Sequence, residues 1–207
     1  MNIGQVVAKQ LRQPYGLLGR FFGLLMNRVN HNLNDFMKRN MDILDTDYIL
    51  EVGFGDGTLI KDMASEINNG KIIGIDFSEV MVAQAKKVNR QYISEGIVDI
   101  QQSSIENIPY AANYFNKICS ANTIYFWPQP ESNAKELYRV LKAGGKLILG
   151  FRTKEQLQNT SFSEHGFQLY SEDSVVSLLS RAGFEDVEIV KEPSKKYDSY
   201  CAIATKI

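Results

Sequence analysis

The chain has 207 residues, of which 44% are apolar and 23% are charged, as in a globular protein with a core large enough to fold without disulfides. These proportions exclude a disordered or fibrous protein. A net charge of −1 gives no reason to expect nucleic acid as a partner. The charge is unevenly distributed, because residues 1–40 hold six Lys and Arg against Asp35 alone.

The cysteine pattern and the apolar runs predict a cytoplasmic protein. Cys119 and Cys201 lie within apolar segments, so we expect both thiols to be reduced and buried. No apolar run reaches the roughly 18 residues of a membrane-spanning helix, and no secretory segment is recognisable. No His, Cys and carboxylate residues have metal-ligand spacing, so no metal is predicted.

Residues 1–45 are predicted to form an N-terminal helical extension that precedes the main domain at residues 46–207. Apolar side chains recur at about 100° per residue along one face of this segment. They are Leu18, Phe22, Leu25, Met26, Val29, Leu33, Phe36 and Met37. One hypothesis is a lid over a ligand cleft, and the other is a membrane-surface helix flanked by basic residues 1–40. The lid is favoured because the charge is modest and three glycines interrupt the segment.

From residue 48 short apolar segments alternate with segments of helix length. Strands are predicted at 48–53, 71–76, 96–102, 115–122 and 145–151, with helices at 57–67, 78–93 and 130–143. The strands are apolar almost throughout, as in a parallel sheet that is buried on both faces. This order predicts right-handed crossovers and a doubly wound, Rossmann-like α/β fold.

The C-terminal residues depart from this alternation. A helix is predicted at 171–183, followed by strands at 184–192 and 197–207 that only PSKK separates. So short a connection allows an antiparallel hairpin but no crossover. We therefore expect a mostly parallel, seven-stranded sheet that ends in an antiparallel hairpin.

The clearest functional feature is the segment ILEVGFGDG at 49–57, in which a strand leads through Gly53, Gly55 and Gly57 into a helix. Glycines allow a tight turn and close contact between backbone and ligand. About 20 residues further on, the second strand ends in Asp76, whose carboxylate can accept both hydroxyls of a ribose. Together these features predict an adenosine-type ligand.

Two ligand classes fit this pattern. A dinucleotide site needs the spacing G-x-G-x-x-G, whereas this chain has G-x-G-x-G followed by Thr58. Glu51 also precedes the first glycine by two residues, where it would repel a pyrophosphate. An acid at this position is compatible with a ligand that carries an ammonium and a sulfonium.

Four motifs in order resemble those of class I S-adenosylmethionine-dependent methyltransferases, and most closely the ubiquinone and menaquinone biosynthesis branch. They are EVGFGDG, IIGIDFSEVM at 72–81, SIENIPY at 104–110 and RVLKAGGKL at 139–147. The resemblance covers roughly residues 48–151. It implies S-adenosylmethionine as the cofactor and a methyl transfer reaction.

The resemblance also implies a role for individual residues. The cofactor site would comprise Glu51, Gly53, Phe54, Gly55, Gly57, Asp76, Phe77, Met81, Ser103, Ser104, Ile105 and Asn122. The glycines would lie under the methionine part, with Glu51 orienting water or the amino group. Asp76 would bind the ribose, while Phe77 and Met81 would flank the adenine. The family usually has Asp where this chain has Ser104, which leaves cofactor affinity in question.

Methyl transfer requires alignment and exclusion of water, and it needs a base only when the acceptor must lose a proton. Candidate catalytic residues are Asn122 and Tyr125 after the fourth strand, and His165 between the fifth strand and the next helix. Asn122 and Tyr125 have the N-x-x-Y spacing of nucleic-acid amino methyltransferases but lack their prolines. His31 is expected at the surface.

We therefore predict an enzyme, an S-adenosylmethionine-dependent methyltransferase that acts on a small molecule, with a lipophilic acceptor as one option. A non-catalytic S-adenosylmethionine-binding protein is the main alternative, and an NAD(P)-dependent oxidoreductase is a weaker one. Binding of S-adenosylmethionine, S-adenosylhomocysteine and NAD would separate these classes. The sequence indicates neither the acceptor nor an oligomeric state.

Overall fold

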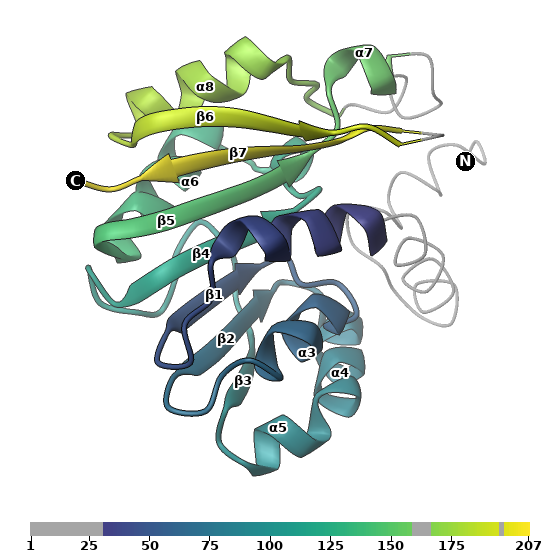
Figure 1. Cartoon of the computed structure of the whole chain (residues 1–207), viewed down its shortest axis with the longest axis vertical. Helices are drawn as coiled ribbons and strands as arrows, with labels where there is room; N and C mark the ends of the chain where they lie inside the picture. Colours follow the sequence, from purple (N-terminus) through teal and green to yellow (C-terminus); the bar gives the residue numbers. More distant parts are fainter. Residues whose placement is uncertain (1–30, 159–166, 195–196) are drawn as a thin grey trace.

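The computed structural model describes residues 31–158, 167–194 and 197–207, and a seven-stranded sheet forms its centre (Figure 1). The strand order is β3-β2-β1-β4-β5-β7-β6. The strands are β1 (Tyr48–Val52), β2 (Lys71–Asp76), β3 (Val98–Gln102), β4 (Phe115–Ala121), β5 (Leu141–Phe151), β6 (Glu185–Glu192) and β7 (Ser199–Thr205). Strand β7 runs antiparallel to β5 and β6, and the other pairs are parallel. The predicted Rossmann-like sheet with a terminal hairpin is confirmed.

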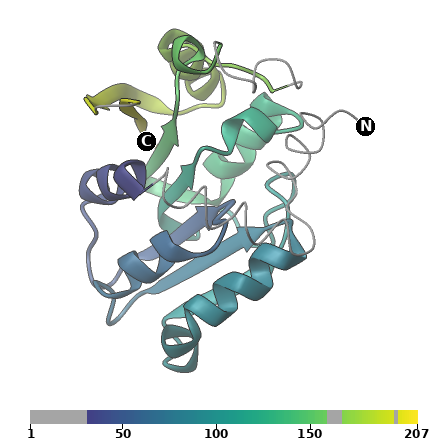
Figure 2. The ribbon, with the colours of Figure 1, turned by 90° about the vertical axis from the view of Figure 1, so that its right-hand side faces the viewer.

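Helices cover both faces of this sheet, as Figure 2 shows from the side of the carboxyl ends of the parallel strands. Besides a helix at residues 31–41, the structure has α3 (Thr58–Ala64), α4 (Glu79–Val88), α5 (Arg90–Ser94), α6 (Pro130–Val140), α7 (Lys154–Leu157), α8 (Glu172–Arg181) and the 3-10 helix η1 (Ile124–Phe126). Helices α6 and α8 share one buried cluster with the sheet, whereas helix 31–41, α3 and α4 share the other.

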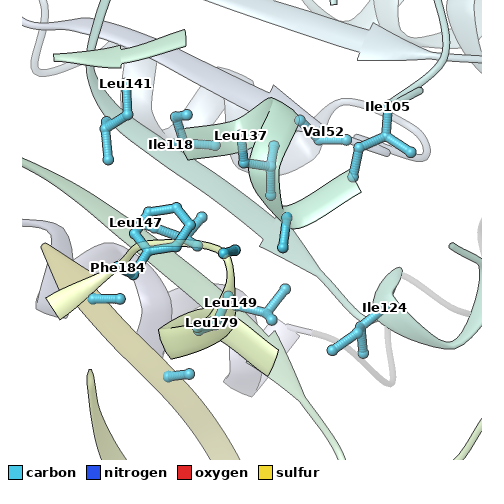
Figure 3. Close-up of a cluster of buried hydrophobic side chains, with 14 of the residues drawn as sticks. Val52, Ile105, Ile118, Ile124, Leu137, Leu141, Leu147, Leu149, Leu179 and Phe184 are labelled. Atoms are coloured by element: carbon cyan, nitrogen blue, oxygen red, sulfur yellow. The ribbon is translucent and has the colours of Figure 1, made fainter. Parts of the chain in front are cut away.

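The first buried cluster joins α6 and α8 to the middle of the sheet (Figure 3). Val52, Ile118 and Leu149 come from β1, β4 and β5, and they pack with Leu137 of α6 and Leu179 of α8. All five side chains are buried. Burial of a side chain of this size contributes about 1.5–3 kcal/mol, so this cluster holds the strand ends that carry the candidate site.

The second cluster includes the described part of the predicted N-terminal extension. Leu33, Phe36 and Met37 lie on one face of helix 31–41 and are buried against the sheet. A Cβ at Gly150 of β5 would lie 2.2 Å from Sδ of Met37, so this close approach requires glycine. Residues 31–41 of the predicted extension thus form a core helix, whereas residues 42–45, also predicted to be helical, belong to the connection to β1. The stripe residues before residue 31 lie outside the described residues, and the lid stays a prediction.

The helix expected at 57–67 already ends at Ala64, and two further predicted helices differ from the observed ones through tertiary contacts. The helix expected at 78–93 divides at Asn89, whose buried side-chain amide donates to the carbonyl oxygens of Gly57 (2.9 Å) and Ala85 (3.0 Å). The helix expected at 130–143 ends at Val140, because Leu141 already pairs with Phe115 of β4. Both differences result from contacts between segments that are distant in the sequence.

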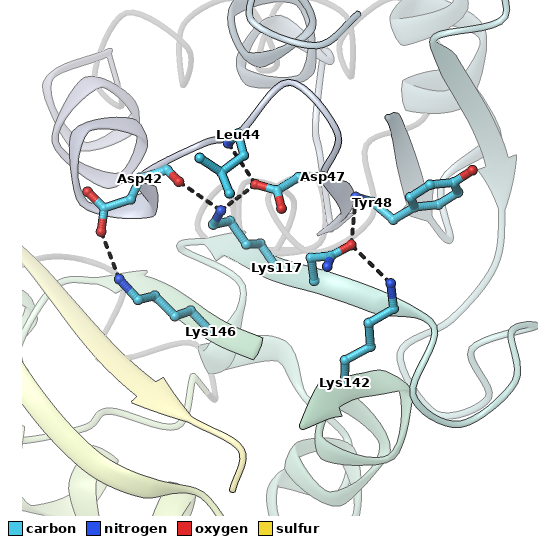
Figure 4. Close-up of polar contacts among 8 residues, drawn as sticks. Asp42, Leu44, Asp47, Tyr48, Lys117, Lys142 and Lys146 are labelled. Carbon is cyan, nitrogen blue, oxygen red and sulfur yellow. Dashed lines mark hydrogen bonds and ion pairs between the residues drawn. The ribbon is translucent and has the colours of Figure 1, made fainter. Parts of the chain in front are cut away.

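A polar cluster fixes the amino-terminal edge of the sheet (Figure 4). Lys117 of β4 is buried, forms an ion pair with Asp47 and donates to the carbonyl oxygen of Asp42 at 2.8 Å. Lys146 of β5 pairs with the Asp42 carboxylate at 2.7 Å. These contacts attach the connection between helix 31–41 and β1 to the sheet, at the edge opposite the candidate site.

Candidate cofactor and acceptor site

The glycine loop after β1 has a backbone that only glycine adopts easily at three positions. Gly53, Gly55 and Gly57 have φ values of +71°, +55° and +80°, in the left-handed region. A Cβ at Gly53 would lie 2.5 Å from Thr123, and one at Gly57 would lie 2.6 Å from Cβ of Ala85. At Gly55, by contrast, no described atom lies within 4 Å of that position. Gly55 therefore borders open space, as expected for a backbone that lies against a ligand.

Asp76 at the end of β2 turns back towards this loop. Its carboxylate accepts from the Gly55 amide at 3.3 Å and from the Ser78 amide at 2.9 Å. Burial raises the pKa of Asp76 to about 6, while the two backbone hydrogen bonds oppose this rise. Asp76, the residue predicted to bind the ribose, thus contacts the glycine loop directly, and its carboxylate is largely ionised at neutral pH.

Glu51 in the centre of the sheet is 2% exposed, and among the described residues its Oε2 atom has no hydrogen-bond partner. Burial raises the pKa of Glu51 well above its ordinary value, and the charges of Asp56, Asp76 and Asp62 raise it further. The site is therefore rich in carboxylates at the β1 and β2 side. Such a site suits a ligand with positive charge and disfavours a pyrophosphate.

The residues predicted to surround the adenine are only partly brought together. Phe77 follows Asp76 and is 41% exposed, so its ring is accessible to a ligand. The backbone amide of Ser103 donates to the Asp76 carbonyl at 3.1 Å, which places the 103–105 loop beside Asp76, the predicted ribose-binding residue. Ser104 Oγ exchanges hydrogen bonds with Glu106, donating to its carboxylate and accepting from its amide, both at 3.2 Å.

Three further residues that were predicted to bind the cofactor have buried side chains. Phe54 and Met81 lie in the cluster beneath α3 and α4, and Ile105 lies in the opposite cluster. The Phe54 ring packs over Gly74, where an added Cβ would lie 2.8 Å from Cδ1 of the ring. Because these side chains are buried in the core, only their backbone atoms are available to contact a cofactor. Their predicted roles stay predictions.

Asn122 and Tyr125 lie together at the carboxyl end of β4. Asn122 has a left-handed φ of 54°, and its backbone N–H donates to the Gly150 carbonyl at 2.8 Å. The Tyr125 hydroxyl lies 3.3 Å from Asn122 Oδ1 and 3.1 Å from the Arg152 carbonyl, and it accepts from the Arg152 amide. Burial raises the pKa of Tyr125, so its phenol stays protonated and is a poor base.

The aromatic residues after Tyr125 divide between core and site. Trp127 is buried in the cluster with α6 and donates its Nε1 hydrogen to Thr123 Oγ1 at 3.1 Å. Phe126 is partly buried and contacts Phe167 edge to face, with ring centroids 5.1 Å apart. His165 lies outside the described residues. His31 is exposed and pairs with Asp35 on its own helix at 3.3 Å, as predicted for a surface histidine.

The sequence analysis did not single out Thr123 or Arg152. Thr123 packs against Gly53 and so joins the β4 turn to the glycine loop. Arg152 follows the last residue of β5 and shares the Tyr125 hydroxyl with Asn122. The available signal was a charged residue directly after the apolar run LILGF, at the strand edge where ligands bind in this type of sheet.

This geometry fits S-adenosylmethionine. The open position at Gly55, the inward carboxylate of Asp76 and the unsatisfied oxygen of Glu51 match a nucleoside with a cationic side chain. Among residues 31–158, 167–194 and 197–207, no group of three or more His, Cys, Asp or Glu side chains is arranged to hold a metal ion.

The sheet order and the loop together define the class of Rossmann-like methyltransferases, and comparisons with known proteins agree. A family model described as a methyltransferase domain matches residues 50–149. The uncharacterised methyltransferase YdaC of Bacillus subtilis is 32% identical over 185 residues, which are 89% of this chain and 97% of that protein. The chain belongs to this methyltransferase family, and the expectation of a class I S-adenosylmethionine-dependent methyltransferase is confirmed at the level of family and fold.

More distant relatives carry the names of quinol methyltransferases. A rice (Oryza sativa subsp. japonica) chloroplast 2-methyl-6-phytyl-1,4-hydroquinone methyltransferase is 28% identical over 150 residues, which are 72% of this chain. The chain spans 44% of that plant protein's length. The crystal structure of a SAM-dependent methyltransferase from Aquifex aeolicus superposes with a TM-score of 0.73 and 22% identity, covering 98% of each chain, which supports the fold.

The fold alone does not fix the reaction. The crystal structure of the [4+2]-cyclase SpnF superposes equally well, with a TM-score of 0.73 and 20% identity over 84% of this chain. Function must therefore be argued from the site. Within the part of the chain that the structure describes, no helix combines the length and apolarity needed to span a bilayer.

Proposed function

We propose that this protein transfers the methyl group of S-adenosylmethionine to a small, lipophilic acceptor of the hydroquinone kind. The observation that carries the proposal is the open position at Gly55 beside the inward-facing carboxylate of Asp76. Both lie at the carboxyl ends of adjacent parallel strands, next to the end of β4. In sheets of this type, ligands bind at that edge.

The residues of the chain would bind and align rather than activate. S-Adenosylmethionine supplies a methyl group that its sulfonium already activates for in-line displacement. Asp76 would accept hydrogen bonds from the ribose hydroxyls, and Glu51 would face the amino group of the methionine part. Asn122 would present its side-chain amide beside the methionine carboxylate. Holding donor and acceptor in line accounts for most of the acceleration that such a site can offer.

The acceptor side of the proposal is supported by aromatic residues and by the relatives. Tyr125 and Phe126 line the β4 turn, and the Phe126 ring contacts Phe167. Planar aromatic side chains suit a planar, apolar acceptor. Several relatives are named for hydroquinone or quinone substrates. A cytoplasmic location and the absence of a nucleic-acid partner stay predictions from the composition.

Two measurements test the proposal in order. Isothermal titration calorimetry with S-adenosylhomocysteine, S-adenosylmethionine and NAD should give binding of the first two only. Turnover is then followed as S-adenosylhomocysteine release with 2-geranyl-1,4-hydroquinone, kept reduced, and with its non-prenylated parent. Binding without turnover on either acceptor would favour a non-catalytic binding protein or another acceptor, and NAD binding would favour an oxidoreductase.

A further inference from the structure

Arg152 lies at the carboxyl edge of the sheet, and its backbone contacts the turn that follows β4. Arg152 is the first residue after β5, and β5 pairs with β4, the strand that carries Asn122. The Tyr125 hydroxyl bonds both the amide and the carbonyl of Arg152 while it lies 3.3 Å from Asn122 Oδ1. The backbone of Arg152 is therefore fixed to the same turn that would border the transferred methyl group.

The guanidinium itself is partly withdrawn from solvent. Its Cζ atom lies 5.0 Å from the centroid of the ring of Tyr197, which precedes β7 by two residues. Burial lowers the pKa of Arg152, although an arginine remains charged at any pH that the folded protein meets.

The charges of the site are divided between its two ends. Asp56 and Asp76 lie near β1 and β2, on the side proposed for the cationic cofactor. Burial raises the pKa of Glu51 beside them, and a bound ammonium would favour its ionised form. Arg152 lies on the other side of β4, next to β5. A site with acids around the donor and a guanidinium around the acceptor favours a positively charged donor and a negatively charged acceptor.

We propose that Arg152 is an acceptor-binding residue that selects acceptors with an acidic hydroxyl and holds that hydroxyl as a phenolate or enolate, flanked by the rings of Tyr125 and Tyr197. The inference rests on the proposed methyltransferase function and specifies the chemical class of its acceptor. A planar guanidinium presents several N–H donors in a fixed geometry, which suits an anionic oxygen on a planar ring.

The reaction balances without a further reactant. The acceptor hydroxyl loses its proton to solvent, and Arg152 stabilises the remaining negative oxygen. An electron pair of that oxygen, or of the ring carbon conjugated with it, forms the new bond to the methyl carbon while the bond from that carbon to sulfur breaks. When carbon is methylated, the ring carbon then releases its own proton to restore aromaticity. The sulfonium becomes a neutral thioether, so the opposite charges of donor and acceptor cancel.

The decisive variant is Arg152→Gln, compared with Arg152→Lys and with a matched control. Lys191→Gln removes another cation that lies over an aromatic ring, 5.3 Å from the Tyr200 centroid, but on the outermost strand β6. Arg152→Gln should lower kcat/KM for 2-geranyl-1,4-hydroquinone by about ten- to hundredfold, the range of a hydrogen bond to a charged group. The rise of kcat/KM with pH should also move to higher pH by about one unit or more, because one unit corresponds to 1.36 kcal/mol of stabilisation of the ionised hydroxyl. Arg152→Lys should retain part of both properties, and Lys191→Gln should retain all of them.

A binding measurement keeps the inference independent of turnover. Protein loaded with S-adenosylhomocysteine should bind 4-nitrophenolate, detected by its absorbance, and should not bind 4-nitroanisole. Arg152→Gln should lose the phenolate binding while circular dichroism and affinity for S-adenosylhomocysteine stay unchanged. If the wild-type protein binds neither compound, or if Arg152→Gln binds 4-nitrophenolate normally, the inference is overturned. Failure of hydroquinone turnover alone, with phenolate binding that depends on Arg152, would instead contradict the acceptor class in the proposed function.

Discussion

Substitution of the middle glycine of the loop separates ligand binding from folding. Gly55 and Gly57 have similar backbone conformations, with φ values of +55° and +80°. Their surroundings differ, since an added Cβ at Gly55 meets nothing within 4 Å, whereas one at Gly57 would lie 2.6 Å from Cβ of Ala85 and 2.8 Å from Nδ2 of Asn89. Alanine at the two positions should therefore have different consequences.

The expected magnitudes follow from these contacts. A non-glycine residue in the left-handed region costs about 1–2 kcal/mol, which both variants share. Gly57→Ala adds overpacking against α4, at about 1–3 kcal/mol, so its free energy of unfolding should fall by roughly 2–5 kcal/mol. Gly55→Ala should lose only the first amount and should fold, but its methyl group would occupy the space proposed for the cofactor. Its affinity for S-adenosylhomocysteine should fall at least tenfold.

Two assays on the same samples test this expectation. Urea denaturation followed by circular dichroism gives the loss of stability of Gly55→Ala and Gly57→Ala, and calorimetry gives the affinity for S-adenosylhomocysteine. The wild-type protein and a surface variant, Lys135→Ala on α6, serve as controls. A folded Gly55→Ala that binds S-adenosylhomocysteine as tightly as the wild type would refute the placement of the ligand beside this residue.

Four further outcomes are expected. Calorimetry should show that the affinity for S-adenosylhomocysteine falls as pH drops below about 6. The reason is that the Asp76 carboxylate, whose pKa is raised to about 6, must be ionised to accept the ribose hydroxyls. The Asp76→Asn variant should bind more weakly at pH 8 and lose this pH dependence. Because of the same raised pKa, the folded apoprotein binds more protons than the unfolded chain between pH 3.8, the ordinary pKa, and about pH 6. The contribution of Asp76 to the free energy of unfolding is therefore lost as pH rises through that window. The Asp76→Asn variant should show a flatter dependence of the free energy of unfolding on pH there, measured by urea denaturation. In urea denaturation, Lys117→Met should lower the free energy of unfolding by about 3–5 kcal/mol, because it leaves the buried Asp47 carboxylate without its ion pair. The double variant that also carries Asp47→Asn should recover part of this loss. Removal of residues 1–30 should leave a core that still unfolds cooperatively in urea but binds cofactor more weakly if that segment is a lid. Salt-sensitive sedimentation with anionic liposomes that disappears on truncation would instead support the membrane hypothesis.

The sequence was sufficient for the parts of the fold that depend on local pattern. Apolar runs identified the five parallel strands, and the short link between the last two predicted strands indicated the antiparallel hairpin. The glycines at 53, 55 and 57 were placed correctly after β1, because a run of alternate glycines between a strand and a helix has few other structural uses. Asp76 was found for the same reason, since its distance from the loop follows from the length of one strand–helix–strand unit.

The parts that sequence pattern missed depend on contacts across the sheet. Asn89 ends α4 because its amide bonds the carbonyl of Gly57, 32 residues earlier. Leu141 leaves the predicted helix because a backbone partner on β4 is available to it. Arg152 becomes part of the candidate site only through Tyr125, 27 residues before it. Neither periodicity nor motif spacing contains this information, because each contact involves a backbone position set by the tertiary fold.

The N-terminal segment shows why an apolar stripe alone leaves a role open. A core helix, a lid and a membrane-surface helix all bury one apolar face, so periodicity does not distinguish them. What assigns residues 31–41 to the core is the flat surface of β5 at Gly150, which admits Met37. Lys38 and Arg39 also lie in ion pairs with Glu66 and Glu192. The other four basic residues of the extension, and no acidic ones, fall within residues 1–30. Each basic residue near an anionic membrane surface contributes about 1 kcal/mol of attraction, so the charge that a membrane role requires resides in that segment rather than in the helix fixed to the sheet.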